Sequence, residues 1–437
     1  MAALVGSNVS INVIRILGNL VLTRLLSPEM FGAIAIITTI QYVLVMLTDM
    51  GFNQFVVRAA DGDKKRFLDV IWTARLARNG ALCLLMVALS GPLAAAFGKP
   101  ELQPGIAAAS FVLLVEGFRS MAPLVAERQW RVSYVSAVEL AVFVIQTIVV
   151  LIAAAVMRDY WAIILSMFVS AVAGVVFSYA LFPDSRQRFA FDRGILVEML
   201  KFARFIMPSS AITIVLAQAD KVVLGRNLAL EQFGLYSLAA SLTVAGRNLI
   251  YQWGTRMLYP RFSEAFREDP ASLKAVFYPM RRRFGMLMAF GCGGLIGGGE
   301  LLAQILFDPR YLAAGLYISI LSAAPLLYVI SVPAEMAMVA IGRVQSQLEA
   351  NICRLGSLAI LIPLGLQFGG LLGIVAAFVL MEVPAALYWL WRLRVAGLVD
   401  WREEALQMLP ALPGAAIGLG ATKLAARLIA TGVLPPF

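Results

Sequence analysis

Residues 22–32 read LTRLLSPEMFG, and residues 224–234 read LGRNLALEQFG. Each segment follows one long apolar run and precedes another, and six of the eleven aligned positions are identical at an offset of 202 residues. The identical pairs are Leu22/Leu224, Arg24/Arg226, Leu26/Leu228, Glu29/Glu231, Phe31/Phe233 and Gly32/Gly234. A second half that reuses the opening of the first half is typical of transporters with two similar lobes around a central site. The alternative is a chance similarity between two polar loops, which the shared flanking helices and the shared Phe-Gly pair disfavour.

The composition predicts an all-α polytopic membrane protein. Of the residues, 61% are hydrophobic and 14% charged, with a mean hydropathy of +0.84, more apolar surface than a soluble domain buries. A spanning helix needs about 20 apolar residues. The twelve predicted spans are 4–22, 32–57, 76–97, 104–126, 132–156, 160–182, 205–225, 233–258, 284–307, 312–341, 352–369 and 370–391. A thirteenth, 408–431, is left open because it contains two prolines and two cations. The first span runs into a repeat unit, so we expect no cleavable signal peptide.

Charge in the loops predicts the orientation and the lobes. The loops after even-numbered spans hold most of the Lys and Arg residues, and Arg354 is counted among them. By the positive-inside rule these loops and the N-terminus are cytoplasmic, so the net charge of +10 indicates topology rather than nucleic-acid binding. The expected organisation is an N-terminal lobe (1–182), a cytoplasmic linker (183–204), a C-terminal lobe (205–391) and a cytoplasmic loop with a possible extra helix (392–437). A short amphipathic interfacial helix is expected late in the linker.

Several classes of chemistry lack their residues in this sequence. There is no histidine, which removes the commonest metal ligand and general base. Cys83, Cys292 and Cys353 lie far apart inside apolar runs, as small buried residues do. No GxxxxGK[ST] loop for nucleotide phosphates is present. We therefore expect no cofactor, no metal site and no enzymatic activity.

Polar side chains form stripes on predicted spans. On the first span, one stripe consists of Asn8, Asn12, Arg15 and Asn19. These residues follow steps of four, three and four, so they share one helix face. An arginine in such a row is too costly to face lipid. We expect spans one, two, seven and eight to line a shared aqueous cavity, whereas the alternative is hydrogen bonding between helices. The candidate cavity residues are Asn8, Asn12, Arg15, Asn19, Tyr42, Asp49, Asn53, Ser241, Arg247 and Asn248.

The remaining charges inside spans have simpler interpretations. Glu116 and Arg119, three residues apart, are expected to pair locally. Arg75 and Arg78 are expected to extend to the membrane interface. The run Arg281-Arg282-Arg283 is interpreted as an orientation signal, with lipid headgroup binding as the alternative. Single acids in otherwise apolar spans are weaker candidates for carrying a proton or sodium ion; these are Glu139, Glu300, Glu335 and Glu382. The glycine run at 291–299 permits either bending or close packing.

Three stretches resemble a known family. RLLSPEMFGAIAI after the polar first span, LTDMGFNQFVVR at 47–58 and ADKVVLGRNLALEQFGLYSLAASL at 219–242 are similar to the polysaccharide transporter family, which includes Wzx-type flippases. The resemblance covers most of the chain and marks the family but not the sugar. That family belongs to the multidrug/oligosaccharidyl-lipid/polysaccharide exporter superfamily. The resemblance therefore implies two six-helix lobes in a V-shaped, alternating-access arrangement.

The resemblance implies a flippase for polyprenyl-diphosphate-linked oligosaccharide in the bacterial inner membrane. Arg15 matches a diphosphate-binding position, Arg247 is a second candidate, and Asp49 matches the acid before the glycine that ends span two. The expected partners are the lipid-linked oligosaccharide, membrane lipid and polysaccharide polymerase machinery, with no nucleic acid. A cation-coupled small-molecule exporter of the same superfamily stays an alternative. A membrane glycosyltransferase or polymerase is disfavoured by the short odd-numbered loops and the absence of histidine.

Overall fold

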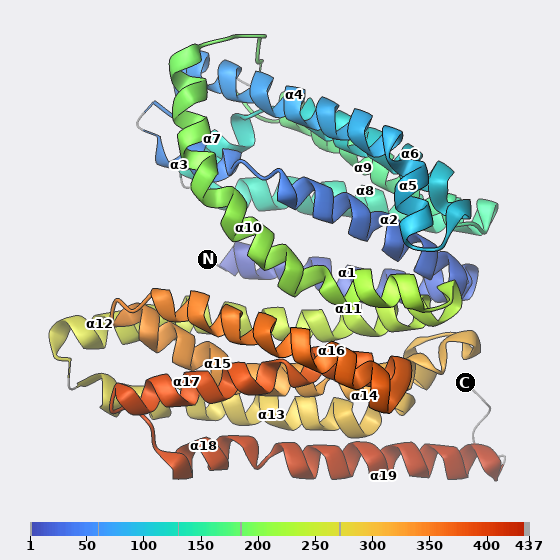
Figure 1. The fold of residues 1–437 in the computed structure, drawn as a ribbon, viewed down its shortest axis with the longest axis vertical. Helices are drawn as coiled ribbons and strands as arrows, with labels where there is room; N and C mark the ends of the chain where they lie inside the picture. Colours follow the sequence, from blue (N-terminus) through green and yellow to red (C-terminus); the bar gives the residue numbers. More distant parts are fainter. Residues whose placement is uncertain (1, 60, 130, 184–185, 271, 432–437) are drawn as a thin grey trace. The chain divides into compact units, whose positions relative to one another are not determined.

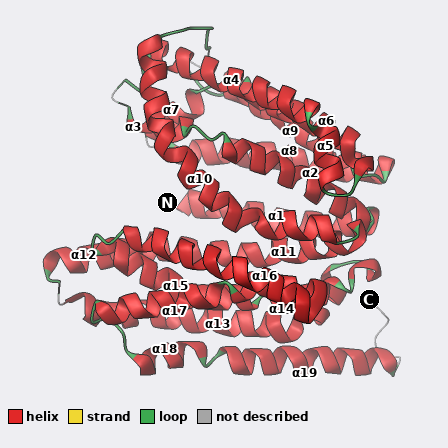
Figure 2. Ribbon diagram, viewed as in Figure 1, coloured by secondary structure: helices red, strands yellow, loops and turns green. Residues whose placement is uncertain are grey.

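The described part of the chain is helical, with no strand among the described residues (Figure 2). The computed structural model describes residues 2–59, 61–129, 131–183, 186–270 and 272–431. The helices of the first half are α1 (Ala2–Leu25), α2 (Pro28–Leu47), α3 (Phe52–Arg58), α4 (Lys65–Ala88), α5 (Ser90–Ala96), η1 (Pro100–Leu102), α6 (Gln103–Gly117), α7 (Ala122–Arg128), α8 (Val132–Met157), α9 (Trp161–Ala180) and α10 (Arg193–Asn227). Those of the second half are α11 (Leu230–Trp253), η2 (Gly254–Leu258), α12 (Tyr259–Glu268), α13 (Ser272–Leu306), η3 (Pro309–Tyr311), α14 (Ala314–Leu321), α15 (Ala323–Ala340), α16 (Gln345–Leu380), α17 (Glu382–Val395), α18 (Trp401–Met408) and α19 (Ala411–Ala430) (Figure 1).

Helices occupy every predicted span, and the chain is a multi-pass membrane protein. Among the described residues, eight helical segments are long and apolar enough to cross a membrane, or nine if the bent pair α6–α7 counts as one span. The segment 401–430 is one of them, although whether it crosses the bilayer stays a prediction. The predicted boundary between residues 369 and 370 coincides with a kink in α16, where Gly370 has a φ of 56°, a backbone conformation that glycine adopts at little cost.

The two copies of the sequence repeat form the same kind of helix corner. The first joins α1 to α2 and the second joins α10 to α11, each across a two-residue break. Leu26 and Leu228 are buried at the break, and the amide of each donates to the carbonyl four residues earlier at 2.8 Å. The glutamates of the repeat, Glu29 and Glu231, lie exposed in the first turn of the following helix, where the helix dipole favours an acid.

By internal contacts the chain divides into two compact units, residues 1–233 and 234–437. This boundary falls near the start of α11, later than the expected linker at 183–204, because α10 packs against α2, α3 and α4. The short interfacial helix expected late in the linker is instead the first part of the 35-residue helix α10. Its Met199 is buried in a cluster with Phe55, Phe67 and Trp72, because its apolar side meets protein rather than the membrane surface.

The first unit is built around pairs of long helices. α1 packs on α8, α8 on α9, α9 on α6, and α6 on α4 and α2. Gly18 of α1 is buried where the helix passes α8, close to Thr147. The small side chain lets α1 approach the helix that carries much of the site described below.

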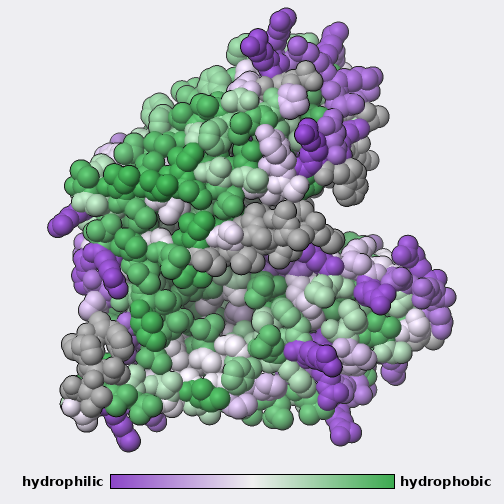
Figure 3. Space-filling model, turned by 180° about the vertical axis from the view of Figure 1, so that it is seen from behind, coloured by the Kyte–Doolittle hydropathy of each residue, from purple (hydrophilic) through white to green (hydrophobic). Residues whose placement is uncertain are grey.

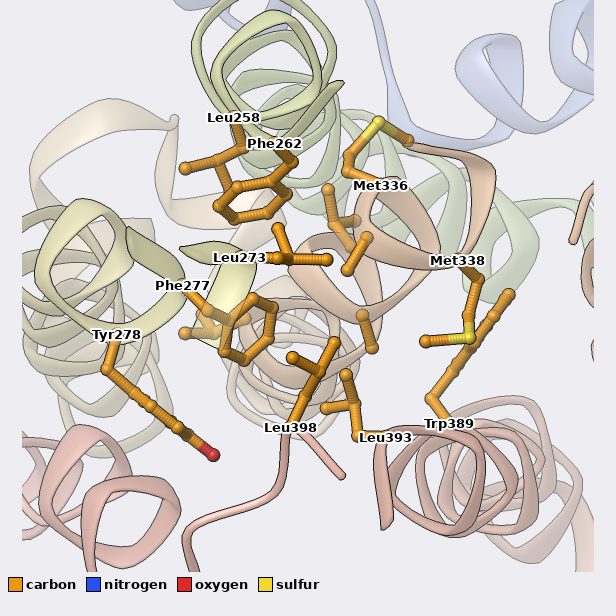
Figure 4. Close-up of a cluster of buried hydrophobic side chains, with 14 of the residues drawn as sticks. Leu258, Phe262, Leu273, Phe277, Tyr278, Met336, Met338, Trp389, Leu393 and Leu398 are labelled. Atoms are coloured by element: carbon orange, nitrogen blue, oxygen red, sulfur yellow. The ribbon is translucent and has the colours of Figure 1, made fainter. Parts of the chain in front are cut away.

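The second unit has a core between α11, α12, α13, α15 and α17. Phe262, Phe277, Met338, Trp389 and Leu393 are buried in it together with other apolar residues (Figure 4). Apolar side chains also lie on the outer surfaces. Large apolar side chains such as Leu84, Val156 and Phe368 are more than 70% exposed, and apolar residues cover much of the surface seen in Figure 3, as lipid contact requires.

The glycine run packs closely against α19. A Cβ atom on Gly293 or Gly297 of α13 would overlap the carbonyl oxygen of Ala411 or Ala415 on α19, and one on Gly418 would overlap backbone of α13. Small residues spaced at four let two helix backbones approach closely in a membrane. Of the two expectations for residues 291–299, the structure therefore shows close packing.

Candidate functional site

A cavity of about 270 Å³ lies within the first unit and contains Arg15. Its lining comes from α1, α8, α9 and the bend between α6 and α7. The lining residues are Ile11, Arg15, Arg119, Glu139, Val142, Phe143, Gln146 and Ser170. The cavity thus gathers two cations, one acid and two neutral hydrogen-bonding groups beside apolar walls, a set that suits a polar, anionic ligand with hydroxyl groups.

One face of α8 supplies half of this lining. Glu139, Val142, Phe143 and Gln146 stand at steps of three, one and three, the spacing of a single helix face. The guanidinium carbon of Arg15 lies 5.7 Å from the centre of the Phe143 ring. A cation over an aromatic face is stabilised by the ring quadrupole, so the ring holds the arginine at the cavity wall.

The bend between α6 and α7 positions Arg119. Helix α6 ends at Gly117 and α7 begins at Ala122, with 59° between the two axes. Backbone groups of the bend are bonded from neighbouring helices: Trp72 Nε1 donates to the Phe118 carbonyl at 3.4 Å, and Arg75 donates to the Arg119 carbonyl. The amide of Ser120 donates to Ser178 Oγ at 2.9 Å. Bonds from α4 and α9 thereby satisfy polar backbone groups that a helix break leaves open.

Two predictions about charges near this cavity are wrong. A third, the local pairing of Glu116 with Arg119, stays a prediction: α6 ends between the two residues, yet their charges still interact. Arg75 and Arg78 do not extend to the membrane interface: Arg75 donates to the bend, and Arg78 donates to Val45 and Thr48 carbonyls at the end of α2. Both arginines satisfy carbonyl oxygens at helix ends, a favourable place for a cation.

Of the other predicted residues of the first lobe, none whose side chain is described lines this cavity. The side chains of Asn8 and Asn12 lie outside the described residues. Asn19 is half-buried on α1 but does not line the cavity. Tyr42 of α2 and Asn53 of α3 are exposed.

Asp49 sits in the break between α2 and α3. Its carboxylate accepts from the amide of Gly51 at 3.0 Å, and Gly51 has a φ of 68°. This carboxylate therefore stabilises a turn that glycine makes at little cost. The geometry explains an acid two residues before a glycine without a ligand, and a role of Asp49 in binding stays a prediction.

The three predicted residues of the second lobe lie on α11. Ser241 Oγ donates to the Leu238 carbonyl at 2.7 Å, and Asn248 is exposed. The guanidinium carbon of Arg247 lies 5.8 Å from the centre of the Tyr328 ring. The shared cavity expected from spans one, two, seven and eight stays a prediction, since the cavity described above belongs to the first unit alone.

Arg247 borders a buried charged network that the sequence did not indicate. Arg354 Nε lies 2.9 Å from Glu382 Oε2, with side chains 11% and 2% exposed. Tyr328 Oη donates to Glu382 at 3.3 Å, and Arg354 donates to Asn351 Oδ1 at 2.8 Å. The assignment of Arg354 to a loop is wrong, because it lies in the third turn of α16 and pairs with Glu382. Glu382 is correspondingly not a lone acid.

The run Arg281-Arg282-Arg283 also divides by environment. Arg281 is fully buried and forms a two-fold ion pair with Glu404 of α18, at 2.8 and 2.9 Å. Tyr278 Oη donates to the same carboxylate at 3.0 Å. Only Arg282 and Arg283 are exposed, so the three cations do not form one headgroup-binding patch.

Sequence reasoning missed part of the cavity. Arg119 was assigned to a local pair, Glu139 was weighed only as a proton or ion carrier, and Gln146 and Ser170 were not singled out. A signal for two of them was present: Glu139 and Gln146 are seven residues apart, two helical turns on one face of a very apolar span. No pattern in the sequence indicates that the bend brings Arg119 to the same place.

Comparison with known proteins agrees with this architecture. Residues 21–314 match the family described as polysaccharide biosynthesis protein. The chain belongs to this polysaccharide biosynthesis protein family. The resemblance inferred from the three sequence stretches is thereby confirmed.

Relatives support the assignment, and a solved structure shares the fold. The chain is 24% identical over 248 residues to the succinoglycan biosynthesis transport protein ExoT of Rhizobium meliloti, covering 57% of this chain and 50% of ExoT. It is 20% identical to the lipopolysaccharide biosynthesis protein WzxC of Escherichia coli, covering 83% of this chain and 74% of WzxC. The matched region thus spans only half of ExoT. The solved lipid II flippase MurJ, in an inward closed conformation, has the same fold: TM-score 0.68 and 12% identity, covering 98% of this chain and 100% of MurJ.

Proposed function

We propose that this member of the polysaccharide biosynthesis protein family is a flippase. It moves polyprenyl-diphosphate-linked oligosaccharide from the cytoplasmic to the periplasmic leaflet of the bacterial inner membrane, for surface polysaccharide synthesis. The observation that carries the proposal is the pair of arginines, Arg15 and Arg119, that line one cavity inside an apolar helical unit. Relatives named for polysaccharide transport and biosynthesis add support.

The cavity suits the charged part of such a cargo. Arginine stays charged when it is desolvated and contacts phosphate oxygens through two parallel N–H groups. Two arginines in one cavity match the two phosphates of a diphosphate. Within the described part of the chain, no salt bridge neutralises Arg15 or Arg119, so both charges are available to a ligand. The lipid tail stays in the bilayer throughout.

Movement of the two units then exposes the headgroup to the other side, with no bond made or broken. The N-terminus and the loops after even-numbered spans face the cytoplasm in this proposal, where the precursor is assembled. Polysaccharide polymerase machinery is the expected partner on the opposite side, since it consumes the flipped product.

The proposal is tested in a bacterial host that lacks its own exporter. The chain should restore surface polysaccharide, and Arg15→Ala should abolish it while the amount of protein in the membrane stays unchanged. Arg226→Ala, at an exposed arginine in the last turn of α10, is the matched control and should behave as wild type. Unchanged polysaccharide in Arg15→Ala contradicts the role of Arg15. Drug resistance on overexpression without any restored polysaccharide would favour the small-molecule exporter.

A further inference from the structure

The cavity of the first unit contains an acid that a diphosphate site does not need. Glu139 lies on the same face of α8 as Phe143 and Gln146, and it lines the cavity together with Arg15 and Arg119. Its side chain is exposed to the cavity. Within the described part of the chain, no salt bridge or hydrogen bond occupies its carboxylate. Because like charges repel, this carboxylate cannot face phosphate oxygens when a diphosphate is bound.

A carboxylate accepts hydrogen bonds and donates none when ionised. Any group of the cargo that it binds therefore offers O–H or N–H, and the groups of this kind nearest to the diphosphate belong to the first sugar. Gln146 lies seven residues, or two helical turns, from Glu139 on the same face of α8. Its amide group both donates and accepts hydrogen bonds. Together the two side chains complement the vicinal hydroxyl groups of a sugar ring, while Phe143 supplies an apolar wall.

The size of the cavity indicates which part of the cargo it contacts. At about 270 Å³ it lies just below the range of about 300–1,000 Å³ that is usual for small-molecule sites. The cavity is open to its surroundings, so it suits a diphosphate with the first sugar while the rest of the oligosaccharide extends out of it.

We propose that Glu139 is a specificity determinant that selects a neutral first sugar and rejects an acidic one. This inference rests on the proposed function and names the part of the cargo that the cavity reads. A uronate in the first position would place a second carboxylate against Glu139, where repulsion in a partly desolvated site is costly. Two arginines and one glutamate give the cavity a net charge of one positive. A diphosphate with two negative charges already exceeds this, so the further negative charge of a uronate is not neutralised.

The test measures binding of short-chain analogues to the full-length protein in detergent by calorimetry. The probes are citronellyl diphosphate alone, citronellyl-diphosphate-hexose and citronellyl-diphosphate-hexuronate. Wild type should bind the hexose compound at least tenfold more tightly than the hexuronate compound. Glu139→Gln, which keeps the shape of the side chain and removes its charge, should bring this ratio close to one without weakening citronellyl diphosphate. Glu231→Gln, at an exposed acid in the first turn of α11, should keep the wild-type ratio.

A second variant keeps the inference testable if Glu139→Gln fails to fold. Glu139→Asp retains the charge on a shorter side chain, so it should still reject the hexuronate while binding the hexose less tightly than wild type. Equal affinities of wild type for both sugars, or an unchanged ratio in Glu139→Gln, would overturn the inference and leave the proposed function intact. Failure of wild type to bind citronellyl diphosphate itself would instead contradict the proposed diphosphate site.

Discussion

The two units place their intramembrane charges in opposite ways. In the first unit, Arg15, Arg119 and Glu139 line a cavity, and no salt bridge joins them within the described residues. In the second, the guanidinium of Arg354 lies 2.9 Å from the carboxylate of Glu382 in a nearly buried ion pair. The hydroxyl of Tyr328 donates a hydrogen bond to the same carboxylate. A charge in a membrane helix is tolerated when it is paired or faces water. The comparison teaches that the second unit uses this pair to hold helices together, whereas the three cavity charges of the first unit have no such pair and, in our proposal, are available for a ligand.

Breaking the buried pair should give the largest effect. Glu382→Ala leaves the Arg354 guanidinium buried and unpaired, which typically costs about 3–5 kcal/mol. The thermal unfolding midpoint in detergent should fall steeply. The double variant Arg354→Met/Glu382→Leu removes both charges and should recover most of that loss. If the double variant is as unstable as the single one, the pair is not the reason for the loss.

Removing the cavity arginine should act on binding and not on folding. Arg15→Ala is expected to lose about 1.5–3 kcal/mol of diphosphate binding, the range for hydrogen bonds to charged groups, with the unfolding midpoint unchanged. Arg15→Lys keeps the charge but not the paired N–H groups, so its diphosphate affinity should lie between those of wild type and Arg15→Ala. Titration with citronellyl diphosphate measures the affinity of both variants. A drop in the unfolding midpoint as large as that of Glu382→Ala would erase the contrast between the units.

Arg247 lies between the two kinds of environment, half-buried beside Tyr328. If it reaches the ligand, Arg247→Ala should weaken diphosphate binding by about 0.5–1.5 kcal/mol, the range for an ordinary hydrogen bond. The same titration decides this, with Leu249→Ala, at an exposed residue of the same helix, as the control. Unchanged affinity would assign Arg247 wholly to the network around Tyr328.

The smallest expected effect concerns the ring beneath Arg15. Phe143→Leu keeps an apolar wall but removes the aromatic face, and cation–π contacts contribute about 0.5–1 kcal/mol at exposed sites. Diphosphate affinity should fall by a factor of roughly 2–5. A loss as large as that of Arg15→Ala would mean that the ring, and not the charge, carries the binding.

Much of the fold was predictable because hydropathy and length alone locate membrane helices. Helices occupy all predicted spans, with breaks inside 32–57 and 104–126, and the repeat at 22–32 and 224–234 correctly marks two equivalent helix corners. The break at Gly370 was predicted to within one residue. The errors arise where helices bend or where charges meet across helices: Arg119 after the end of α6, Arg354 opposite Glu382, and Arg281 opposite Glu404. Spacing within one helix does not report such long-range pairs.

The candidate site was predictable only in part for the same reason. Arg15 stands out in sequence because an arginine in a polar stripe cannot face lipid, and it does line a cavity. Asp49 was chosen from a polar stripe on the second span and from its place before a glycine, and a turn explains its place before the glycine equally well. Glu139 and Gln146 are identified as cavity residues only once the packing of α1 on α8 places them beside Arg15.

The central claim is that the cavity of the first unit carries a diphosphate through Arg15. The most direct measurement is the rate at which a labelled polyprenyl-diphosphate glycan crosses the bilayer of vesicles that contain the purified protein. The account predicts rapid crossing with wild type and with Arg226→Ala, and crossing near that of protein-free vesicles with Arg15→Ala. Equal rates for wild type and Arg15→Ala, at equal amounts of folded protein, would contradict it.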